Sequence, residues 1–113
     1  MNDENKTQKI LGELSSKLKG LYGNNLDRMI LYGSYARNDY SDESDIDIMV
    51  IVGGGDDVIK KSEKDLNFIE SRMSLNYDVT LSVFVRSSEH FDRWKDSMPF
   101  YRNIVKEGVE IYE

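Results

Sequence analysis

Apolar residues recur at helical spacing in two long segments of the chain. The first segment predicts a helix from about Lys6 to Tyr22. Its expected buried stripe consists of Ile10, Leu11, Leu14, Leu18 and Leu21. The second segment begins at the acidic pair Asp56-Asp57, which favours a helix start through the helix dipole. The stripe expected there consists of Ile59, Ser62, Leu66, Ile69 and Met73. Each helix should therefore pack one face on a common core.

Two runs of strand character lie between these helices. The shorter run extends from Arg28 to Tyr32, and the longer run is "SDIDIMVIV", residues 44–52. Successive side chains of a strand point to opposite faces. One face of the longer run carries Ile46, Ile48, Val50 and Val52, and the other carries Asp45, Asp47, Met49 and Ile51. Since both faces are apolar beyond Asp47, we expect a central strand covered on both sides.

The segment "NYDVTLSVFVR" has a clean period of two, which predicts a third strand over residues 76–86. Its polar face would carry Asp78, Thr80 and Ser82. Asp78 would then stand at the start of this strand. A neighbouring strand could bring it beside Asp45 and Asp47.

The C-terminal region predicts further helices and a final strand. "SSEHFDRW" has serine caps and an acid in its first turn, Pro99 begins a shorter helix, and Gly108 ends it. The aromatic residues Trp94, Phe100 and Tyr101 are expected in the core, with part of the cluster available to an interface. "VEIYE", residues 109–113, is expected to be a short strand.

The element order α-β-α-β-α-β-α-β predicts an α/β (α+β) fold with a small mixed sheet flanked by helices. A length of 113 residues fits one domain, residues 1–113.

Asp45 and Asp47 are spaced to hold a divalent metal ion. At normal strand rise their Cα atoms lie roughly 6.5 Å apart on one face, so their carboxylates can converge on one cation. Oxygen ligands without histidine or cysteine favour Mg²⁺ or Mn²⁺. A dication would also offset the cost of two carboxylates beside an apolar strand. The alternative is a pair of solvated acids at a turn and a strand edge.

Gly33-Ser34 ends the first strand, and "YARN" after it has the character of a first helical turn. Glycine lets the backbone approach a ligand closely, and a helix start attracts phosphate. The Ser34 hydroxyl can donate to a phosphate oxygen, while Arg37 either contacts a phosphate or pairs with Asp39, Asp42 or Glu43. Phosphates on one side and metal-binding acids on the other indicate nucleotidyl transfer from a triphosphate. Asp78 is the candidate third acid beside the attacking hydroxyl.

The composition limits the classes of partner that we expect the chain to bind. The net charge of −6 argues against general nucleic-acid binding, which uses a basic surface. Binding of a single nucleotide through metal ions stays compatible with it. No apolar run approaches the length of a membrane span, and the polar N-terminus is unlike a signal peptide. The absence of cysteine excludes a thiolate site and agrees with a cytoplasmic location.

Gly33-Ser34 followed after ten residues by Asp45-Ile46-Asp47 resembles the signature of the DNA polymerase beta nucleotidyltransferase superfamily. The short length resembles its minimal nucleotidyltransferases, the MNT family. The resemblance extends through "YDVTLSV" and "PFYRNIVKEGVEIY" and covers about residues 29–112. The family often has glycine where this chain has Asn38, and asparagine tolerates a left-handed turn.

The resemblance implies a polymerase-beta-like fold and transfer of AMP from ATP to a hydroxyl, with release of pyrophosphate. It implies phosphate handling by Gly33 and Ser34, and metal binding by Asp45 and Asp47 with Asp78 as third carboxylate. It also implies an antitoxin whose acceptor is a tyrosine of a HEPN-domain partner. Two other functions stay open: a binding module that neutralises such a partner by occlusion, and a small-molecule nucleotidyltransferase.

Overall fold

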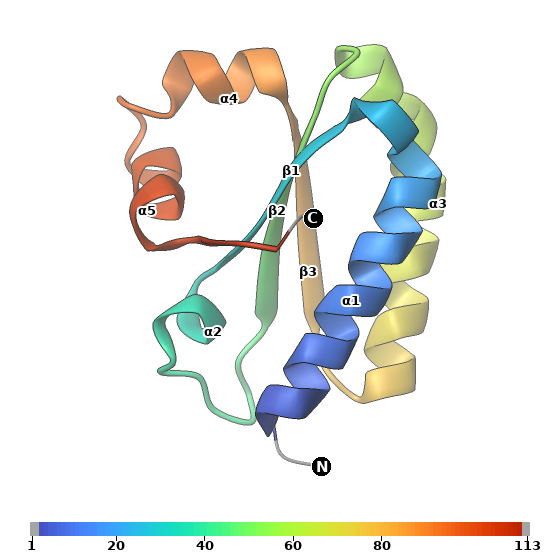
Figure 1. The fold of residues 1–113 in the computed structure, drawn as a ribbon, viewed down its shortest axis with the longest axis vertical. Coiled ribbons are helices and arrows are strands. Elements are labelled where there is room, and N and C mark those ends of the chain that lie inside the picture. The colour runs from blue at the N-terminus through green and yellow to red at the C-terminus, as the bar shows by residue number, and fades with distance from the viewer. Residues whose placement is uncertain (1–2, 112–113) are drawn as a thin grey trace.

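The computed structural model describes residues 3–111, which form a sheet between two layers of helices (Figure 1). One layer holds α1 (Asp3–Tyr22) and α3 (Asp56–Tyr77). The other holds α2 (Ser34–Arg37), α4 (Ser88–Trp94) and α5 (Pro99–Glu107). The strands are β1 (Leu26–Tyr32), β2 (Ile46–Val52), β3 (Leu81–Ser87) and β4 (Val109–Glu110), and a short 3-10 helix, Gly23–Asn25, joins α1 to β1. The predicted order is confirmed, with the last helical region divided into α4 and α5.

The sheet is mixed, with strand order β3-β2-β1-β4. Strand β2 pairs parallel with β3 and antiparallel with β1, and β1 also pairs antiparallel with β4. The even-numbered apolar residues of β2 belong to a core with α1 and α3, while Met49 and Ile51 pack with Phe91 and Tyr101 of α4 and α5. The prediction of a central strand covered on both sides is therefore confirmed.

The outer edge of β3 is closed by side chains. The backbone N–H of Leu81 donates to Ser74 Oγ at 3.1 Å, and that of Val83 donates to Glu70 Oε2 at 2.8 Å. Farther along, Arg86 Nη1 donates to the carbonyl of Val85 at 2.8 Å. An edge strand normally offers such groups to another strand. Here α3 and Arg86 occupy several of them.

The predicted start of the third strand is wrong. Helix α3 continues through Tyr77, and β3 begins only at Leu81. Asp78 is the C-cap of α3, with φ 54° and ψ 51°, and the N–H of Val79 donates to the carbonyl of Ser74 at 3.1 Å. This six-to-one hydrogen bond is typical of a Schellman ending, which left-handed aspartate tolerates better than most residues. Asp78 therefore lies outside the sheet.

The C-terminal region follows the prediction in most details. Ser87 Oγ caps α4 by accepting from the His90 N–H, Pro99 begins α5, and Gly108 follows its end. The aromatic cluster divides, because Tyr101 is buried while Trp94 and Phe100 are 40% and 45% exposed. The predicted final strand is shorter than expected, at Val109–Glu110, and its last two residues lie outside the described part of the chain.

A buried hydrogen bond joins the two long helices. Ser62 Oγ donates to the carbonyl of Ile59, so the Tyr22 hydroxyl, 2.9 Å away, donates to Ser62. We expect Tyr22→Phe to lower the free energy of unfolding by about 1 kcal/mol, because Ser62 then loses a buried donor. Urea denaturation measures the loss. Tyr77→Phe is the control, since Tyr77 donates to Glu13 in a less buried setting, and equal losses in both variants would contradict the expectation.

Candidate active site

The turn at Gly33 lies against a carboxylate of β2. Gly33 has φ 76° and ψ −155°, a conformation that is essentially restricted to glycine. A Cβ atom at this position would lie 2.5 Å from Oδ2 of Asp47. The single helical turn α2 follows, and Asn38 ends it in the left-handed conformation with φ 62°. The prediction that asparagine serves this turn is confirmed.

Asp45 and Asp47 share an electrostatic environment. Asp45 is exposed just before β2, whereas Asp47 is half-buried in the strand, opposite Tyr32 of β1. Burial, and then the negative charge of Asp45, raises the pKa of Asp47, while Arg37 acts in the opposite direction. The two acids thus repel each other at neutral pH. A cation between them would relieve this repulsion, so the pair fits a hard divalent metal ion.

Arg37 connects the glycine turn to the C-terminal helix. Its guanidinium pairs with Asp39 at 3.1 Å and with Glu107 of α5 at 3.4 Å. The predicted pairing with Asp39 is confirmed, while the partner on α5 was not anticipated. A cavity of about 180 Å³ lies beside this pair, and its lining includes Gly33, Tyr32 and Asn103. The last helix therefore forms part of the wall next to the carboxylates.

Tyr32 of β1 lies directly opposite Asp47 of β2, on the side of that strand away from β3. Burial, followed by the charge of Asp47, raises the pKa of Tyr32 to about 12, and Arg86 of β3 partly offsets this rise. The ring of Tyr32 also packs edge-on against Phe100, with centroids 5.8 Å apart. Tyr32 is therefore a neutral phenol at physiological pH, placed next to the proposed metal-binding pair.

The structure does not bring Asp78 to Asp45 and Asp47. Among residues 3–111, no group of three or more His, Cys, Asp and Glu side chains is arranged to hold a metal ion. Instead, the β2–β3 register places Ser82 beside Asp47. The third-carboxylate role of Asp78 stays a prediction, without the strand position on which it was based.

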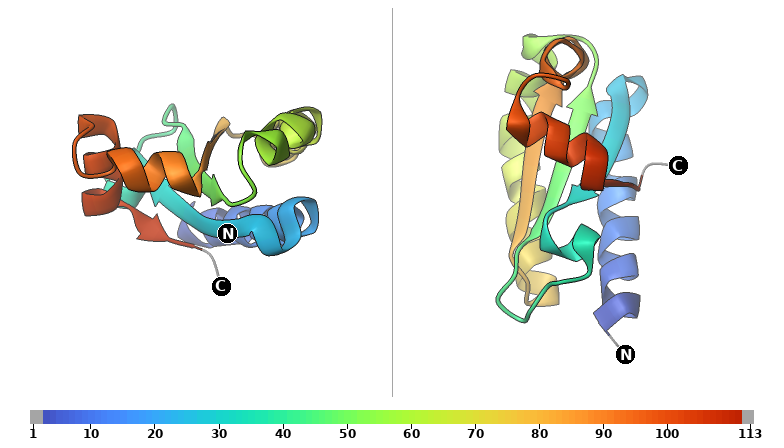
Figure 2. Two further views of the ribbon diagram at one scale, coloured as in Figure 1. Left: turned by 90° about the horizontal axis from the view of Figure 1, so that it is seen from above. Right: turned by 90° about the vertical axis from the view of Figure 1, so that its left-hand side faces the viewer.

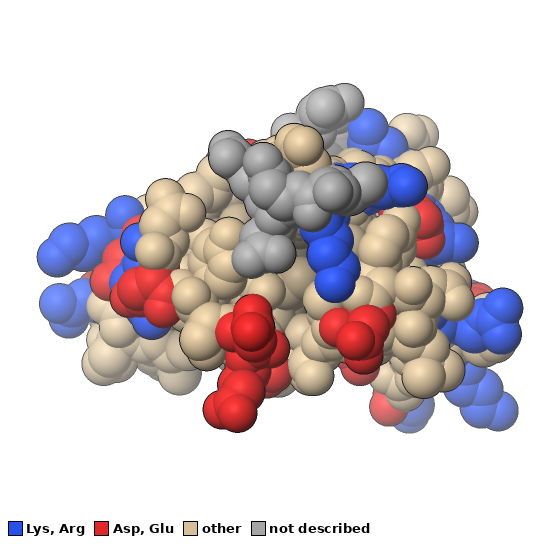
Figure 3. Space-filling model, turned by 90° about the horizontal axis from the view of Figure 1, so that it is seen from below, with Lys and Arg blue, Asp and Glu red and all other residues tan. Residues whose placement is uncertain are grey.

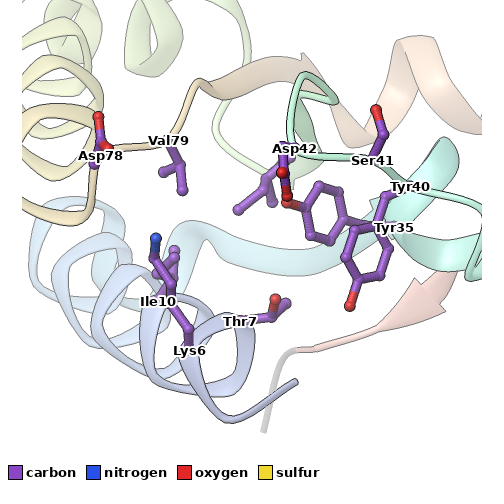
Figure 4. Close-up of a pocket in the computed structure, with 10 residues that line it drawn as sticks. Lys6, Thr7, Ile10, Tyr35, Tyr40, Ser41, Asp42, Asp78 and Val79 are labelled. Carbon is purple, nitrogen blue, oxygen red and sulfur yellow. The ribbon is translucent and has the colours of Figure 1, made fainter. Parts of the chain in front are cut away.

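Asp78 lines a different cavity, of about 340 Å³, near the N-terminus of α1 (Figure 4). Lys6 lies on one side of it, and Tyr35 and Asp42 lie on the other. The rings of Tyr35 and Tyr40 stack at this wall with centroids 4.1 Å apart. Seen from below, the described residues at this end of the molecule show separate groups of acidic side chains and form no continuous basic surface (Figure 3).

A glycine turn packed against paired carboxylates in a mixed sheet is the arrangement expected of a nucleotide-transferring domain. The chain belongs to the nucleotidyltransferase domain family, whose sequence model matches residues 8–111. This match confirms the predicted superfamily and class of enzyme. None of the helices within residues 3–111 is long and apolar enough to cross a membrane.

Two proteins of Methanocaldococcus jannaschii, each named "Putative protein adenylyltransferase", are similar to the chain. One is 32% identical and covers 99% of this chain and 100% of its own length. The other is 38% identical over 67% of this chain and 75% of its own length. A solved structure described as a toxin-antitoxin with AMP-PNP is 20% identical, has a TM-score of 0.54, and covers 98% of this chain and 73% of that one. The likeness to that structure supports the predicted fold class.

Proposed function

We propose that the protein transfers AMP from ATP to a tyrosine hydroxyl of a protein partner, using Mg²⁺ or Mn²⁺ held by Asp45 and Asp47. The contact between Gly33 and the Asp47 carboxylate carries the proposal, because it sets a turn suited to phosphate directly against a metal-binding acid. The names of the two relatives support a protein as acceptor. The description of the structural neighbour, a toxin-antitoxin with AMP-PNP, supports ATP as donor and a toxin as partner. A HEPN-domain identity for that toxin, with this chain as its cytoplasmic antitoxin, is the part of the proposal that rests on the family resemblance alone.

Different residues would bind the phosphates and the metal ion during the transfer. The backbone at Gly33 and the hydroxyl of Ser34 bind phosphate oxygens, and Arg37 can exchange its exposed carboxylate partners for a phosphate. Mg²⁺ on Asp45 and Asp47 would supply positive charge to the α-phosphate and to the leaving pyrophosphate. The acceptor oxygen forms a bond to the α-phosphorus as the bond to the bridging oxygen breaks. The phenolic proton passes to water, and pyrophosphate leaves.

Ser82 beside Asp47 favours a phenol as the acceptor. A serine hydroxyl is a poor proton acceptor compared with a carboxylate, so this position offers little help in deprotonating the attacking group. A tyrosine hydroxyl has a pKa near 10, far below that of an aliphatic alcohol, and needs less help. The same feature favours the second candidate, a binder that occludes its partner without transfer. Neutralisation of the partner in the absence of ATP would identify that function.

Transfer of label from α-labelled ATP to the partner tests the proposal. We expect Asp45→Asn to reduce labelling at least a hundredfold, because one of the two metal ligands is lost. Asp78→Asn should retain labelling within about threefold, since Asp78 is a helix cap outside the carboxylate pair. An equal loss in both variants would instead restore Asp78 as a third carboxylate. Label transfer unaffected by Asp45→Asn would contradict the proposed metal site.

A further inference from the structure

One side of the sheet is only partly covered next to Asp47. Helices α4 and α5 pack on Ile30 of β1 and on Met49 and Ile51 of β2 through a cluster that contains no residue of β3. Figure 2 (right) shows α5 crossing the upper part of this face, with α2 lower down. On the same side, β3 presents Ser82, Phe84 and Arg86, which pair in register with Asp47, Met49 and Ile51. A row of β3 side chains therefore leads away from the candidate active site.

Two aromatic rings are exposed here, one within this row and one on the neighbouring helix α5. Phe84 is 43% exposed and Phe100 of α5 is 45% exposed. They are linked through intermediate contacts, because Arg86 lies over Phe84, Arg86 bonds to Tyr101, and Tyr101 packs against Phe100 with ring centroids 5.6 Å apart. Phe100 in turn contacts Tyr32, next to Asp47. Phe84, Arg86 and Phe100 thus form one surface, the β3–α5 surface, continuous with the carboxylate site.

Hydrogen bonds hold the Arg86 side chain in place, but its positive charge is not part of an ion pair among the described residues. Its Nε donates to the Tyr101 hydroxyl at 3.1 Å, and its Nη1 donates to the carbonyl of Val85 at 2.8 Å. The Tyr101 hydroxyl also lies 3.0 Å from His90 Nε2. Within the described residues, none of the ion pairs includes Arg86. A half-buried guanidinium fixed by neutral partners is pre-organised for an incoming carboxylate.

We propose that the β3–α5 surface docks the acceptor segment of the partner, and that an acidic side chain of this segment binds Arg86. The inference rests on the proposed function, because the target tyrosine must reach Asp47 at one end of the surface. Apolar side chains of the segment would pack on Phe84 and Phe100. The segment lies on the face of β3, since Ser74 and Glu70 already occupy edge N–H groups of that strand.

The strand register sets the distance between the two proposed contacts of the segment, the target tyrosine near Asp47 and the acidic side chain at Arg86. Ser82 marks the level of Asp47, and Arg86 follows four residues later, roughly 13 Å along a strand at about 3.3 Å per residue. An extended segment covers this distance in about four residues. The acidic residue should therefore stand about four positions from the target tyrosine. Recognition would depend on this spacing as well as on the tyrosine itself.

Peptide binding tests docking separately from transfer. The probe is a ten-residue fluorescent peptide that carries glutamate four positions from phenylalanine, which replaces the target tyrosine and prevents reaction. A second peptide has lysine in place of glutamate. By fluorescence anisotropy, we expect the glutamate peptide to bind the wild type about tenfold more tightly than the lysine peptide. Arg86→Gln should remove this preference, and Phe84→Ala should weaken binding of both peptides.

A matched pair on the opposite helix layer provides the control. Arg72 lies over Phe68 of α3 with the same separation of 5.9 Å that joins Arg86 to Phe84, and Phe68 is 65% exposed. Arg72→Gln and Phe68→Ala should leave peptide binding unchanged. Equal effects from both pairs, or an unchanged preference in Arg86→Gln, would overturn the docking proposal. Melting temperatures within a few degrees of wild type establish that each variant is folded.

The variant Asp47→Asn separates this inference from the proposed function. It should bind the glutamate peptide as the wild type does while losing transfer to the corresponding tyrosine peptide. Retained transfer in Asp47→Asn would refute the proposed chemistry and leave the docking result standing. Conversely, tyrosine-peptide labelling that is equally efficient with glutamate and lysine would refute the docking role of Arg86 and leave the chemistry standing.

Discussion

Asp47→Asn is expected to reduce nucleotide transfer by about a thousandfold or more while leaving the protein folded. The amide keeps the size of the side chain, so its contact with Gly33 can persist. It removes the charge on which the proposed metal site depends. Labelling of the partner from α-labelled ATP measures the loss. Transfer at the wild-type rate would exclude Asp47 as a metal ligand.

The same variant should be at least as stable as the wild type without metal. Burial and then Asp45 raise the pKa of Asp47, so the folded protein binds a proton there more readily than the unfolded chain does. The stability gained from this proton is present below the ordinary pKa and is lost as the pH rises through the raised value. Asparagine avoids that loss, so the difference in favour of the variant should grow across this pH window.

Thermal melts with and without Mg²⁺ complete this test. Mg²⁺ should raise the melting temperature of the wild type, because the ion binds the folded carboxylate pair. The increase should be much smaller in Asp47→Asn. If Mg²⁺ stabilised both proteins equally, the cation would be binding elsewhere.

Gly33→Ala is the substitution with the second largest expected effect. Its Cβ would lie 2.5 Å from Oδ2 of Asp47, so either the turn or the carboxylate must move. A displacement of about 1 Å at reacting groups can cost on the order of a hundredfold in rate. The unfavourable φ of 76° adds about 1–3 kcal/mol of strain. We therefore expect transfer to fall at least a hundredfold, together with a lower melting temperature.

Gly55→Ala controls for the strain alone. Gly55 stands before α3 with φ 80° and ψ −171°, close to the conformation of Gly33, but a Cβ there would meet no atom within 4 Å. This variant should lose comparable stability and keep its activity. If both alanine variants lost activity equally, general destabilisation would explain the result, and the contact with Asp47 would not.

The fold was predictable where each pattern had only one physical solution. Strand β2 is apolar on both faces beyond Asp47, and this pattern required cover from two layers. Gly33 was predictable as a position of close approach, although the sequence pointed to a ligand and the structure shows Asp47 as the nearer neighbour. Spacing alone cannot reveal that contact, because it depends on how β1 and β2 pair.

Asp78 illustrates where alternation misleads. Tyr77 and Val79 extend the period of β3 towards its N-terminus, but Tyr77 contacts the core from the end of a helix. The left-handed conformation of Asp78 then breaks the pattern without glycine as a signal. Glu107 was missed for a different reason. It reaches Arg37 across 70 residues of chain, and no local pattern indicates such a pair.

The closed edge of β3 also affects how copies of the protein behave when they are crowded together. A free edge of seven residues would allow molecules to join strand to strand and grow into fibrous assemblies. Ser74, Glu70 and Arg86 occupy hydrogen-bonding groups along this edge, so such growth would first have to break existing bonds. The exposed rings of Phe84 and Phe100 can therefore remain uncovered with a lower risk of precipitation. The chain can keep an exposed aromatic face because several hydrogen-bonding groups of the adjacent strand edge already have side-chain partners.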